Sequence, residues 1–453
     1  MKRILSVFLS VITVISLIFI SGCSDKTALK GEKWYAGFGS SEIEIPCDGS
    51  PLYLAGYKNG IQLSGILDKQ RVNSLWLGTS KEKGILIVSV DCIGLSSDTT
   101  NEIKDMLSGF CRDSGCVSVN IFSTHDHAGA DTLGLWGKPG HDGKNPAFMK
   151  NLYSAVLSSA KAAYKSRSSG KLSYGSTETD GIQEDSRYPY VYQKTMHQFR
   201  FSPDNGKCGT RVIVYPAHAE SLGADNTLLS RDWPGVMSDC IKEECGDNTL
   251  FINGAIGGLI ATSEQSAASP EENMRLTGER LAAYALSTDG FVSLSPTLKV
   301  KTENFKIPLD NTMFMYYRFL GISGNECVPG KSDTGYCVKT SLSVITIGEK
   351  TVLCLPCEIF PELVSGTNSK EDPEPLQSIA ERNGIEGLIV AGLCNDEIGY
   401  VMPPSAFLTD SELPFIKRPA DRSGESHYEE TNSVGKSAAG CIADAFLSAL
   451  KDN

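Results

Sequence analysis

Three of the six histidines in this 453-residue chain directly follow apolar runs, where strand ends are expected. His125 and His127 come after residues 117–122, and His218 comes after residues 211–215. Residues i and i+2 at a strand end face the same side, so His125 and His127 can share one site. Two imidazoles with a carboxylate and one open position are typical of a catalytic zinc, which makes hydroxide available near pH 7 and polarises a carbonyl. The pattern favours a zinc (Zn2+) site over the alternative, structural histidines with satisfied hydrogen bonds.

Two common classes of HxH metal enzyme do not fit. Metallo-β-lactamase-like hydrolases carry HxHxDH, but Gly129 and Ala130 follow Ala128 here and break that motif. Barrel amidohydrolases place HxH on their first strand, whereas here an earlier apolar run, residues 84–90, precedes it.

The elements that must position these histidines alternate between short apolar runs and helical patterns. The predicted strands are residues 84–90, 117–122, 211–215, 249–252, 351–355 and 388–391. Helices are predicted at residues 146–165, with Asn145 as N-cap and Pro146 in the first turn, and at residues 433–450. The predicted fold class is therefore α/β, with α+β left open: mixed β-sheets flanked by helices, with the metal site at strand ends.

Six segments in one order resemble the neutral (non-lysosomal) ceramidases. His125-Asp-His127-Ala-Gly129 is similar to their HTHSG segment, and Pro216-Ala-His218-Ala is similar to an HP-type segment. Four more matches complete the order. Ser230-Arg-Asp232-Trp-Pro-Gly235 is similar to SxDxxGY, Phe251 to Gly258 to a Gly-containing loop, and Pro356-Cys357-Glu358 to PGE. The last match, counted as one, is Asn395 to Phe407 followed by Tyr428 to Ser433, which are similar to NxYxGYVTTPEEY and YEGAST. The resemblance extends over roughly residues 35 to 450.

This resemblance implies a site residue by residue. The zinc ligands would be His125, His218, Glu358 and Tyr400, and His127 would lie beside the metal and hydrogen-bond the substrate carbonyl or oxyanion. Arg187 and Tyr428 would be further catalytic residues close to the substrate. The residues alone leave two alternatives open: Tyr400 as a turn aromatic that packs on Pro403 and Pro404, and Glu358 as an acid at a helix N-terminus.

The chain also departs from the family pattern. Where the ceramidases have G-(D/N)-x-S-P, this chain has Gly257-Gly-Leu-Ile260-Ala, so Ile260 replaces a serine and cannot hydrogen-bond the substrate. Ala128 likewise replaces the serine of HTHSG. We therefore expect the metal chemistry to be retained and the recognition of a ceramide head group to be weakened.

The N-terminal residues predict export and a lipid anchor. Lys2 and Arg3 precede a nearly pure apolar run, and Ser21-Gly22 stand before Cys23, as in a bacterial lipoprotein signal. The predicted organisation is a signal peptide at residues 1–22, a tether at residues 23–34 that begins with the lipidated Cys23, and a single catalytic domain at residues 35–453 without the family's C-terminal β-domain. The alternative is an uncleaved anchor helix, and both interpretations place the chain on the outer side of the cell membrane.

Composition limits the possible partners. The net charge of −12 makes nucleic acid an unfavourable partner, and 41% apolar with 21% charged residues is typical of a globular protein. Thirteen cysteines remain besides Cys23, and Cys354 and Cys357 lie in an apolar run that favours buried structural thiols. We predict a zinc-dependent hydrolase that cleaves the amide bond of an N-acyl (sphingo)lipid or related acylated compound. The alternative is a surface lipoprotein that keeps the fold, with or without the zinc, as a non-catalytic ligand-binding module.

Overall fold

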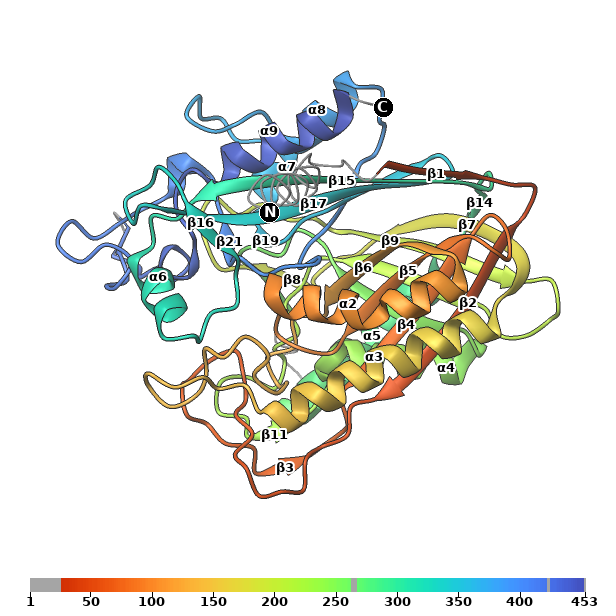
Figure 1. The fold of residues 1–453 in the computed structure, drawn as a ribbon, viewed down its shortest axis with the longest axis horizontal. Coiled ribbons are helices and arrows are strands. Elements are labelled where there is room, and N and C mark those ends of the chain that lie inside the picture. The colour runs from red at the N-terminus through yellow and green to blue at the C-terminus, as the bar shows by residue number, and fades with distance from the viewer. Residues whose placement is uncertain (1–25, 262–266, 422–423, 452–453) are drawn as a thin grey trace, which may run out of the picture.

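Two β-sheets packed face to face form the centre of the protein, and helices cover the outer face of each sheet (Figure 1). The structure is a computed structural model that describes residues 26–261, 267–421 and 424–451. The mixed sheets flanked by helices confirm the predicted α/β class.

The larger sheet has nine strands within the described residues. Its order is β12 (Asn248–Asn253), β10 (Thr210–Tyr215), β9 (Thr195–Pro203), β7 (Ser168–Glu178), β2 (Trp34–Glu42), β4 (Arg71–Gly78), β5 (Gly84–Val90) and β6 (Cys116–Ser123), with β14 (Val292–Ser293) paired to β7. The smaller sheet has the order β1 (Lys26–Lys30), β15 (Thr297–Pro308), β17 (Tyr336–Ile347), β18 (Lys350–Cys354) and β20 (Ile389–Ala391), with β16 (Cys327–Pro329) paired to β17.

Three short strand pairs lie outside these sheets: β3 (Gly65–Ile66) with β11 (Leu228–Leu229), β8 (Gln183–Asp185) with β13 (Leu259–Ala261), and β19 (Glu358–Ile359) with β21 (Tyr400–Val401). The helices are α2 (Ser97–Ser114), α3 (Pro146–Ser166), α4 (Asp232–Cys245), α5 (Pro270–Ser287), α6 (Thr312–Phe319), α7 (Pro361–Ser365), α8 (Leu376–Arg382) and α9 (Ala438–Lys451).

The core is divided between the layers. The space between the sheets is filled by side chains from both, such as Leu75, Phe199 and Ile345. Helices α2 and α3 pack against one part of the outer face of the larger sheet, and α4 and α5 against another. Helix α9 covers the outer face of the smaller sheet, together with α7 and α8.

Three parallel strand pairs place polar residues at neighbouring strand ends. β5 and β6, β10 and β12, and β18 and β20 are parallel neighbours, and one or two helices connect each pair. Parallel neighbours need such a crossover, which returns the chain to the same end of the sheet.

The two edges of the larger sheet also meet. The Ser89 hydroxyl in β5 donates to the Phe251 carbonyl in β12 at 2.6 Å, and the Asn253 side-chain amide donates to the Thr124 carbonyl at 2.6 Å. The accumulated twist of a sheet of this size permits this closure. As a result, the turn after β6 lies close to the turns after β10 and β12, although β6 stands at the opposite end of the sheet order.

Two predicted segments differ from the structure. Part of the predicted tether, Lys26–Lys30, forms β1 against β15, because Leu29 packs on the core between the sheets. The C-terminal helix begins at Ala438, not at residue 433, because the backbone from Ser433 to Gly435 is engaged elsewhere: Ser433 bridges to Gly399, and the Val434 carbonyl accepts from the Asp310 amide at 2.9 Å. Helix α3 begins as predicted, and the Asn145 side chain accepts from the Phe148 amide at 2.9 Å.

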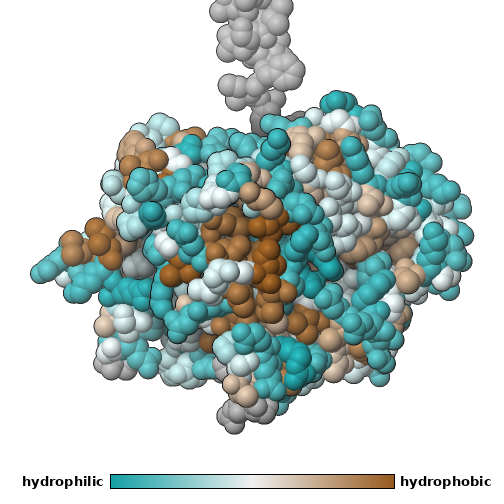
Figure 2. Space-filling view, turned by 90° about the horizontal axis from the view of Figure 1, so that it is seen from below, coloured by the Kyte–Doolittle hydropathy of each residue, from teal (hydrophilic) through white to brown (hydrophobic). Residues whose placement is uncertain are grey.

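The surface toward the viewer in Figure 2 carries a concentration of apolar side chains near its middle, ringed by polar ones. This is the lower side of Figure 1, where β3 lies, and Ile66 and Leu67 are among the exposed apolar residues. No helix of the described residues is long and apolar enough to cross a membrane. The predicted signal peptide and Cys23 lie outside the described residues.

The cysteines of the described ranges are all free thiols. Cys354 and Cys357 are buried, which agrees with the interpretation of this pair as structural.

Candidate metal centre

The turn after β6 aims the His125 ring inward. His125 has a left-handed backbone with φ of 60°, an uncommon conformation for a residue with a side chain. Its Nδ1 lies 2.7 Å from the Ile93 carbonyl, and its Nε2 lies 3.2 Å from the Glu358 carboxylate. A backbone carbonyl at Nδ1 selects the tautomer that leaves Nε2 free to act as a ligand.

His218 repeats this arrangement after β10. Its Nδ1 lies 2.7 Å from the Leu259 carbonyl, and its Nε2 lies 3.1 Å from the same Glu358 oxygen. The Trp233 indole at the start of α4 donates to the His218 carbonyl at 2.9 Å and fixes this turn. Two imidazoles that start from different strands therefore present Nε2 to one carboxylate oxygen.

Glu358 and Tyr400 face each other across the short β19–β21 pair, in which they are direct partners. The Tyr400 hydroxyl lies 3.4 Å from His218 Nε2 and 3.5 Å from the Tyr428 hydroxyl. The four predicted ligands are thus together and buried, although they come from four segments of the chain. The Glu358 carboxylate contacts two histidines and makes no capping hydrogen bond to α7. These contacts favour the ligand interpretation of Glu358 over an acid that serves a helix N-terminus.

The electrostatics of this cluster favour a cation. Burial opposes charge on Glu358, but the adjacent imidazoles of His125 and His218 outweigh burial and hold the pKa of this carboxyl well below its usual range. Burial alone would lower the pKa of His218, yet its contact with Glu358 raises that pKa. Burial, followed by the charge of Glu358, raises the pKa of Tyr400 well above its ordinary value, so without a cation the phenol stays protonated.

The donor atoms also fit a metal ion. Ring nitrogens of His125, His127 and His218 lie within 4.8 Å of one another, so this group could hold a metal. Both ring nitrogens of His127 are buried without a hydrogen-bond partner among the described residues. Buried nitrogens of this kind are costly unless a ligand or ion satisfies them.

His127 lies on the outer side of the cluster, among residues that the sequence did not single out. The Gly56 backbone, with φ of 108°, runs directly against its ring, and a Cβ on Gly56 would lie 2.7 Å from His127 Nδ1. The Tyr57 ring packs edge-on to the His127 ring with centroids 5.1 Å apart. Glu220 lies 3.7 Å from His127 Nδ1 and accepts a hydrogen bond from the Tyr57 hydroxyl at 2.9 Å.

A signal for Glu220 exists in the sequence, because it stands two positions after His218 in the same strand-end segment. None exists for Gly56 and Tyr57, because they lie in an irregular loop that tertiary packing alone brings to the site.

Arg187 contacts the two residues that follow Tyr428 in the chain. Its guanidinium is buried and pairs with Glu430 at 2.7 Å and Glu429 at 3.4 Å, and it donates to the Ala406 carbonyl at 2.6 Å. These contacts anchor the segment that carries Tyr428. Contact of Arg187 with a substrate stays a prediction.

The two positions that depart from the ceramidase pattern have different surroundings. Ile260 in β13 forms a β-bridge with His218, so it lies beside the candidate metal centre. Ala128 is fully buried in an apolar cluster with Leu222 and Met274. The argument about lost substrate contacts therefore depends on Ile260, because the Ala128 methyl has a packing role.

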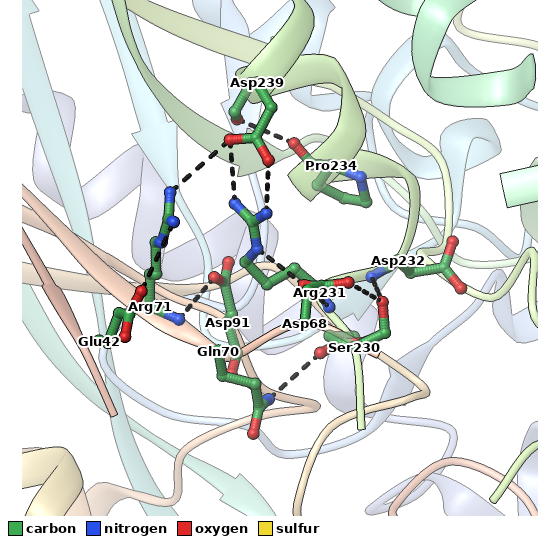
Figure 3. Close-up of polar contacts among 12 residues, drawn as sticks. Glu42, Asp68, Gln70, Arg71, Asp91, Ser230, Arg231, Asp232, Pro234 and Asp239 are labelled. Carbon is green, nitrogen blue, oxygen red and sulfur yellow. Dashed lines mark hydrogen bonds and ion pairs between the residues drawn. The ribbon is translucent and has the colours of Figure 1, made fainter. Parts of the chain in front are cut away.

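A network of polar contacts holds the HxH turn and the start of α4 together (Figure 3). The Gln70 side chain donates to Asp126, between the two histidines, at 3.2 Å and accepts from the Ala130 amide at 3.2 Å. Arg231 pairs with Asp68 at 2.8 Å and Asp239 at 2.6 Å, and Asp239 also lies 3.6 Å from Arg71.

The same network reaches the turn after His218. Asp232, at the N-terminus of α4, accepts from the Ser221 amide at 3.1 Å and the Leu222 amide at 3.0 Å. Both histidine turns are therefore fixed by carboxylates and amides outside the candidate metal centre.

Comparison with solved structures finds bacterial neutral ceramidase. The neutral ceramidase from Pseudomonas aeruginosa is similar over 93% of this chain and 75% of that chain, with a TM-score of 0.71 and 15% sequence identity. A structure described as ceramidase complexed with C2 matches 92% of this chain and 75% of that chain, also with a TM-score of 0.71 and 15% identity. No family model and no curated protein matches the chain. The chain thus has a neutral ceramidase-like fold, as its six motif segments predict.

Proposed function

We propose that this protein is a zinc-dependent hydrolase that cleaves the amide bond of an N-acyl lipid or a related acylated compound. The observation that carries the proposal is the convergence of His125 Nε2 and His218 Nε2 on one oxygen of Glu358, at 3.2 and 3.1 Å, with both Nδ1 atoms on backbone carbonyls. The ligands would be His125, His218, Glu358 and Tyr400. The ceramidase-like fold supports the same reaction class.

A bound zinc ion supplies Lewis acidity, which polarises a carbonyl and makes hydroxide available near neutral pH. The protein would contribute orientation and hydrogen bonds. The backbone carbonyls at Nδ1 of His125 and His218 hold both rings in place, and the network around Gln70 holds the turn between them.

His127 would act on the substrate. Its ring nitrogens are buried and unpartnered beside the ligands, so one of them can donate to the oxyanion that develops during attack on a carbonyl. Burial, then the neighbouring His125 and His218, lowers the pKa of His127 well below its ordinary value, so the ring is neutral and carries one N–H. Tyr428, whose hydroxyl lies 3.5 Å from that of Tyr400, would donate to the leaving amine.

Ceramide itself is a poor candidate for the substrate. Ile260 stands beside His218 where the ceramidase pattern has a serine, so a buried hydroxyl of the substrate would lose a partner there. An unpaired buried polar group costs about 1–3 kcal/mol. We therefore favour a less hydroxylated acyl amide.

The proposal includes a location. Export and lipidation at Cys23 would place the enzyme at the outer side of the cell membrane, within reach of lipid-like substrates. The support is the Ser21-Gly22-Cys23 sequence after an apolar run. Cys23→Ser should release the chain from the membrane fraction, whereas continued membrane attachment of this variant would favour an uncleaved anchor helix.

The function is tested by metal analysis followed by an amidase assay on a panel of N-acyl substrates. We expect about one zinc per chain and hydrolysis of at least one amide, with both lost in His218→Ala. His141→Ala is the matched control, because His141 is exposed and lies apart from the cluster. Zinc without turnover on any amide would favour the non-catalytic binding module, and absence of metal in carefully prepared protein would overturn the zinc assignment.

A further inference from the structure

Among the described residues, one carboxylate beside the candidate metal centre has no positive partner at hydrogen-bond distance. Glu220 Oε2 accepts from the neutral Tyr57 hydroxyl at 2.9 Å and lies 3.7 Å from His127 Nδ1, which is beyond a hydrogen bond. The Glu220 side chain is 19% exposed, so it is largely withdrawn from water and still accessible. A carboxylate in such surroundings gains from a cation that completes its hydrogen bonds.

Three basic residues of described segments around the site have other partners. Lys58, next to Tyr57 in the chain, pairs with Asp225 at 2.8 Å. Arg231 pairs with Asp68 and Asp239. The Arg418 guanidinium lies over the Tyr428 ring, 5.8 Å from the centroid. Their contacts leave the charge of Glu220 for a ligand.

The carboxylate is also held in a fixed position. The Glu220 carbonyl accepts from the Gly223 amide at 3.0 Å, and Asp232 binds the two backbone amides that follow Glu220. His127, whose side chain is nine-tenths buried and whose ring nitrogens are unpartnered, lies between Glu220 and the other imidazoles. A group bound to Glu220 would therefore be close to a carbonyl bound at the candidate metal centre.

We propose that Glu220 and Tyr57 form a subsite for an ammonium group of the substrate, so that the preferred acyl amides carry an amino group near the scissile bond. This inference rests on the proposed function and names its substrate class. The Tyr57 hydroxyl donates to Oε2 of the Glu220 carboxylate and so fixes its orientation. The ammonium group binds this carboxylate from the solvent side, next to His127. A substrate with a carboxylate at the same position is repelled.

The test uses four amides that share an octanoyl chain: N-octanoylethylenediamine, N-octanoylpropylamine, N-octanoylethanolamine and N-octanoyl-β-alanine. The zinc-loaded protein should hydrolyse the cationic amide with a kcat/KM about tenfold or more above the neutral ones, and the anionic amide least well. Glu220→Gln, which keeps the shape of the side chain, should abolish the preference and leave the zinc content unchanged. Asp289→Asn is the control, because it removes an exposed carboxylate from a segment that does not contribute to the subsite.

Calorimetric titration with octylammonium chloride gives a readout that does not depend on turnover. Binding should weaken about tenfold in Glu220→Gln and stay unchanged in Asp289→Asn. If no amide is hydrolysed but this difference is found, the proposed function fails and the subsite stands. Equal kcat/KM for the cationic and neutral amides, or a preference unchanged in Glu220→Gln, overturns the subsite. A stronger preference for N-octanoylethanolamine than for the cationic amide would also overturn it, in favour of a hydroxyl site.

Discussion

At the scale of residues, the two histidines of the HxH motif have different surroundings. His125 is fixed by the Ile93 carbonyl and faces Glu358, whereas both ring nitrogens of His127 lack a hydrogen-bond partner and its outer neighbours are Tyr57 and Glu220. The left-handed backbone at His125, with φ of 60°, departs from the extended alternation that would give both rings the same surroundings. The difference in surroundings predicts separate roles for two residues that the sequence presents as a pair.

His125→Ala should remove most of the zinc, and His127→Ala should retain it. Loss of a ligand makes the ion labile, whereas loss of one oxyanion donor lowers turnover by roughly 10²–10³. Elemental analysis and kcat on the same preparations check both statements. Equal loss of zinc in the two variants would show that His127 is a ligand.

Ile260→Ser should raise activity on ceramide relative to a simple N-acyl amide. The side chain lies beside His218, where a hydroxyl could pair with a polar substrate group, and a regained hydrogen bond corresponds to roughly tenfold in relative kcat/KM. Both substrates are compared in the wild type and in the variant. Wild-type protein that hydrolyses ceramide as well as any simpler amide would contradict the premise.

At the scale of elements, the turns after the strands are held by side chains from other loops. Gln70 binds the HxH turn, Asp232 binds the turn after Glu220, and Gly56 supplies a surface without a side chain for the His127 ring. The orientation of each catalytic group therefore depends on contacts between elements and not on its own strand alone.

Gly56→Ala should lower turnover by at least about tenfold while zinc is retained, because the new methyl would overlap the His127 ring at 2.7 Å and displace it. Gly60→Ala is the control: Gly60 also has a positive φ, of 77°, but a Cβ there meets nothing within 4 Å. Both variants carry the backbone cost of alanine at positive φ, so a difference between them in kcat measures the contact with His127. Equal kcat would contradict the contact.

Asp91→Asn should stabilise the protein at pH 8 more than at pH 4. Burial raises the pKa of Asp91 to about 7, with Arg231 opposing the shift. A folded pKa above the unfolded value means that the stabilising contribution is full below the unfolded pKa of about 4 and is lost as the pH rises through 7. Asparagine can still accept from the Arg71 amide and carries no charge, so its gain at pH 8 is on the order of a few kcal/mol.

Urea unfolding at both pH values measures this effect, with the exposed Asp289→Asn as control. A gain that is the same at pH 4 and pH 8 would rule out a charge-based origin.

At the scale of the whole molecule, the candidate metal centre joins separate parts of the fold. His125 follows an edge strand of the larger sheet, His218 follows β10, and Glu358 lies just after β18 of the smaller sheet. An ion held by these ligands would link the two sheets, since it binds the folded state and finds no preformed site in the unfolded chain.

Removal of zinc by a chelator should therefore lower the melting temperature by several degrees. An ion present at 1,000 times its Kd stabilises the folded state by about 4 kcal/mol. Thermal denaturation with and without chelator measures the shift, and zinc added back should restore it. The melting temperature of His218→Ala should not respond to the chelator, and an unchanged wild-type value would indicate that zinc does not join the sheets.

The sequence by itself determined six of the strands, all of them members of the three parallel pairs, and the residues at their ends. Apolar runs flanked by Gly and Pro predicted β5, β6, β10 and β12, and the same pattern predicted that the polar side chains of a site stand where those runs stop. The Asn145-Pro146 pair marked the start of α3, because a capping side chain and a proline in the first turn are local signals. The resemblance in motif order added Glu358 and Tyr400 to the predicted metal ligands.

Only the tertiary structure decided which of these ends meet and what surrounds them. The approach of the two sheet edges, which brings His125 beside His218, results from twist accumulated over many strands and has no local signal. Gly56, Tyr57 and Gln70 reach the site from loops without periodicity, so no pattern in the sequence marks them. The predicted start of the C-terminal helix at residue 433 was wrong for the same reason. Hydrogen bonds to distant segments, not propensity, hold the backbone from Ser433 to Gly435 outside α9.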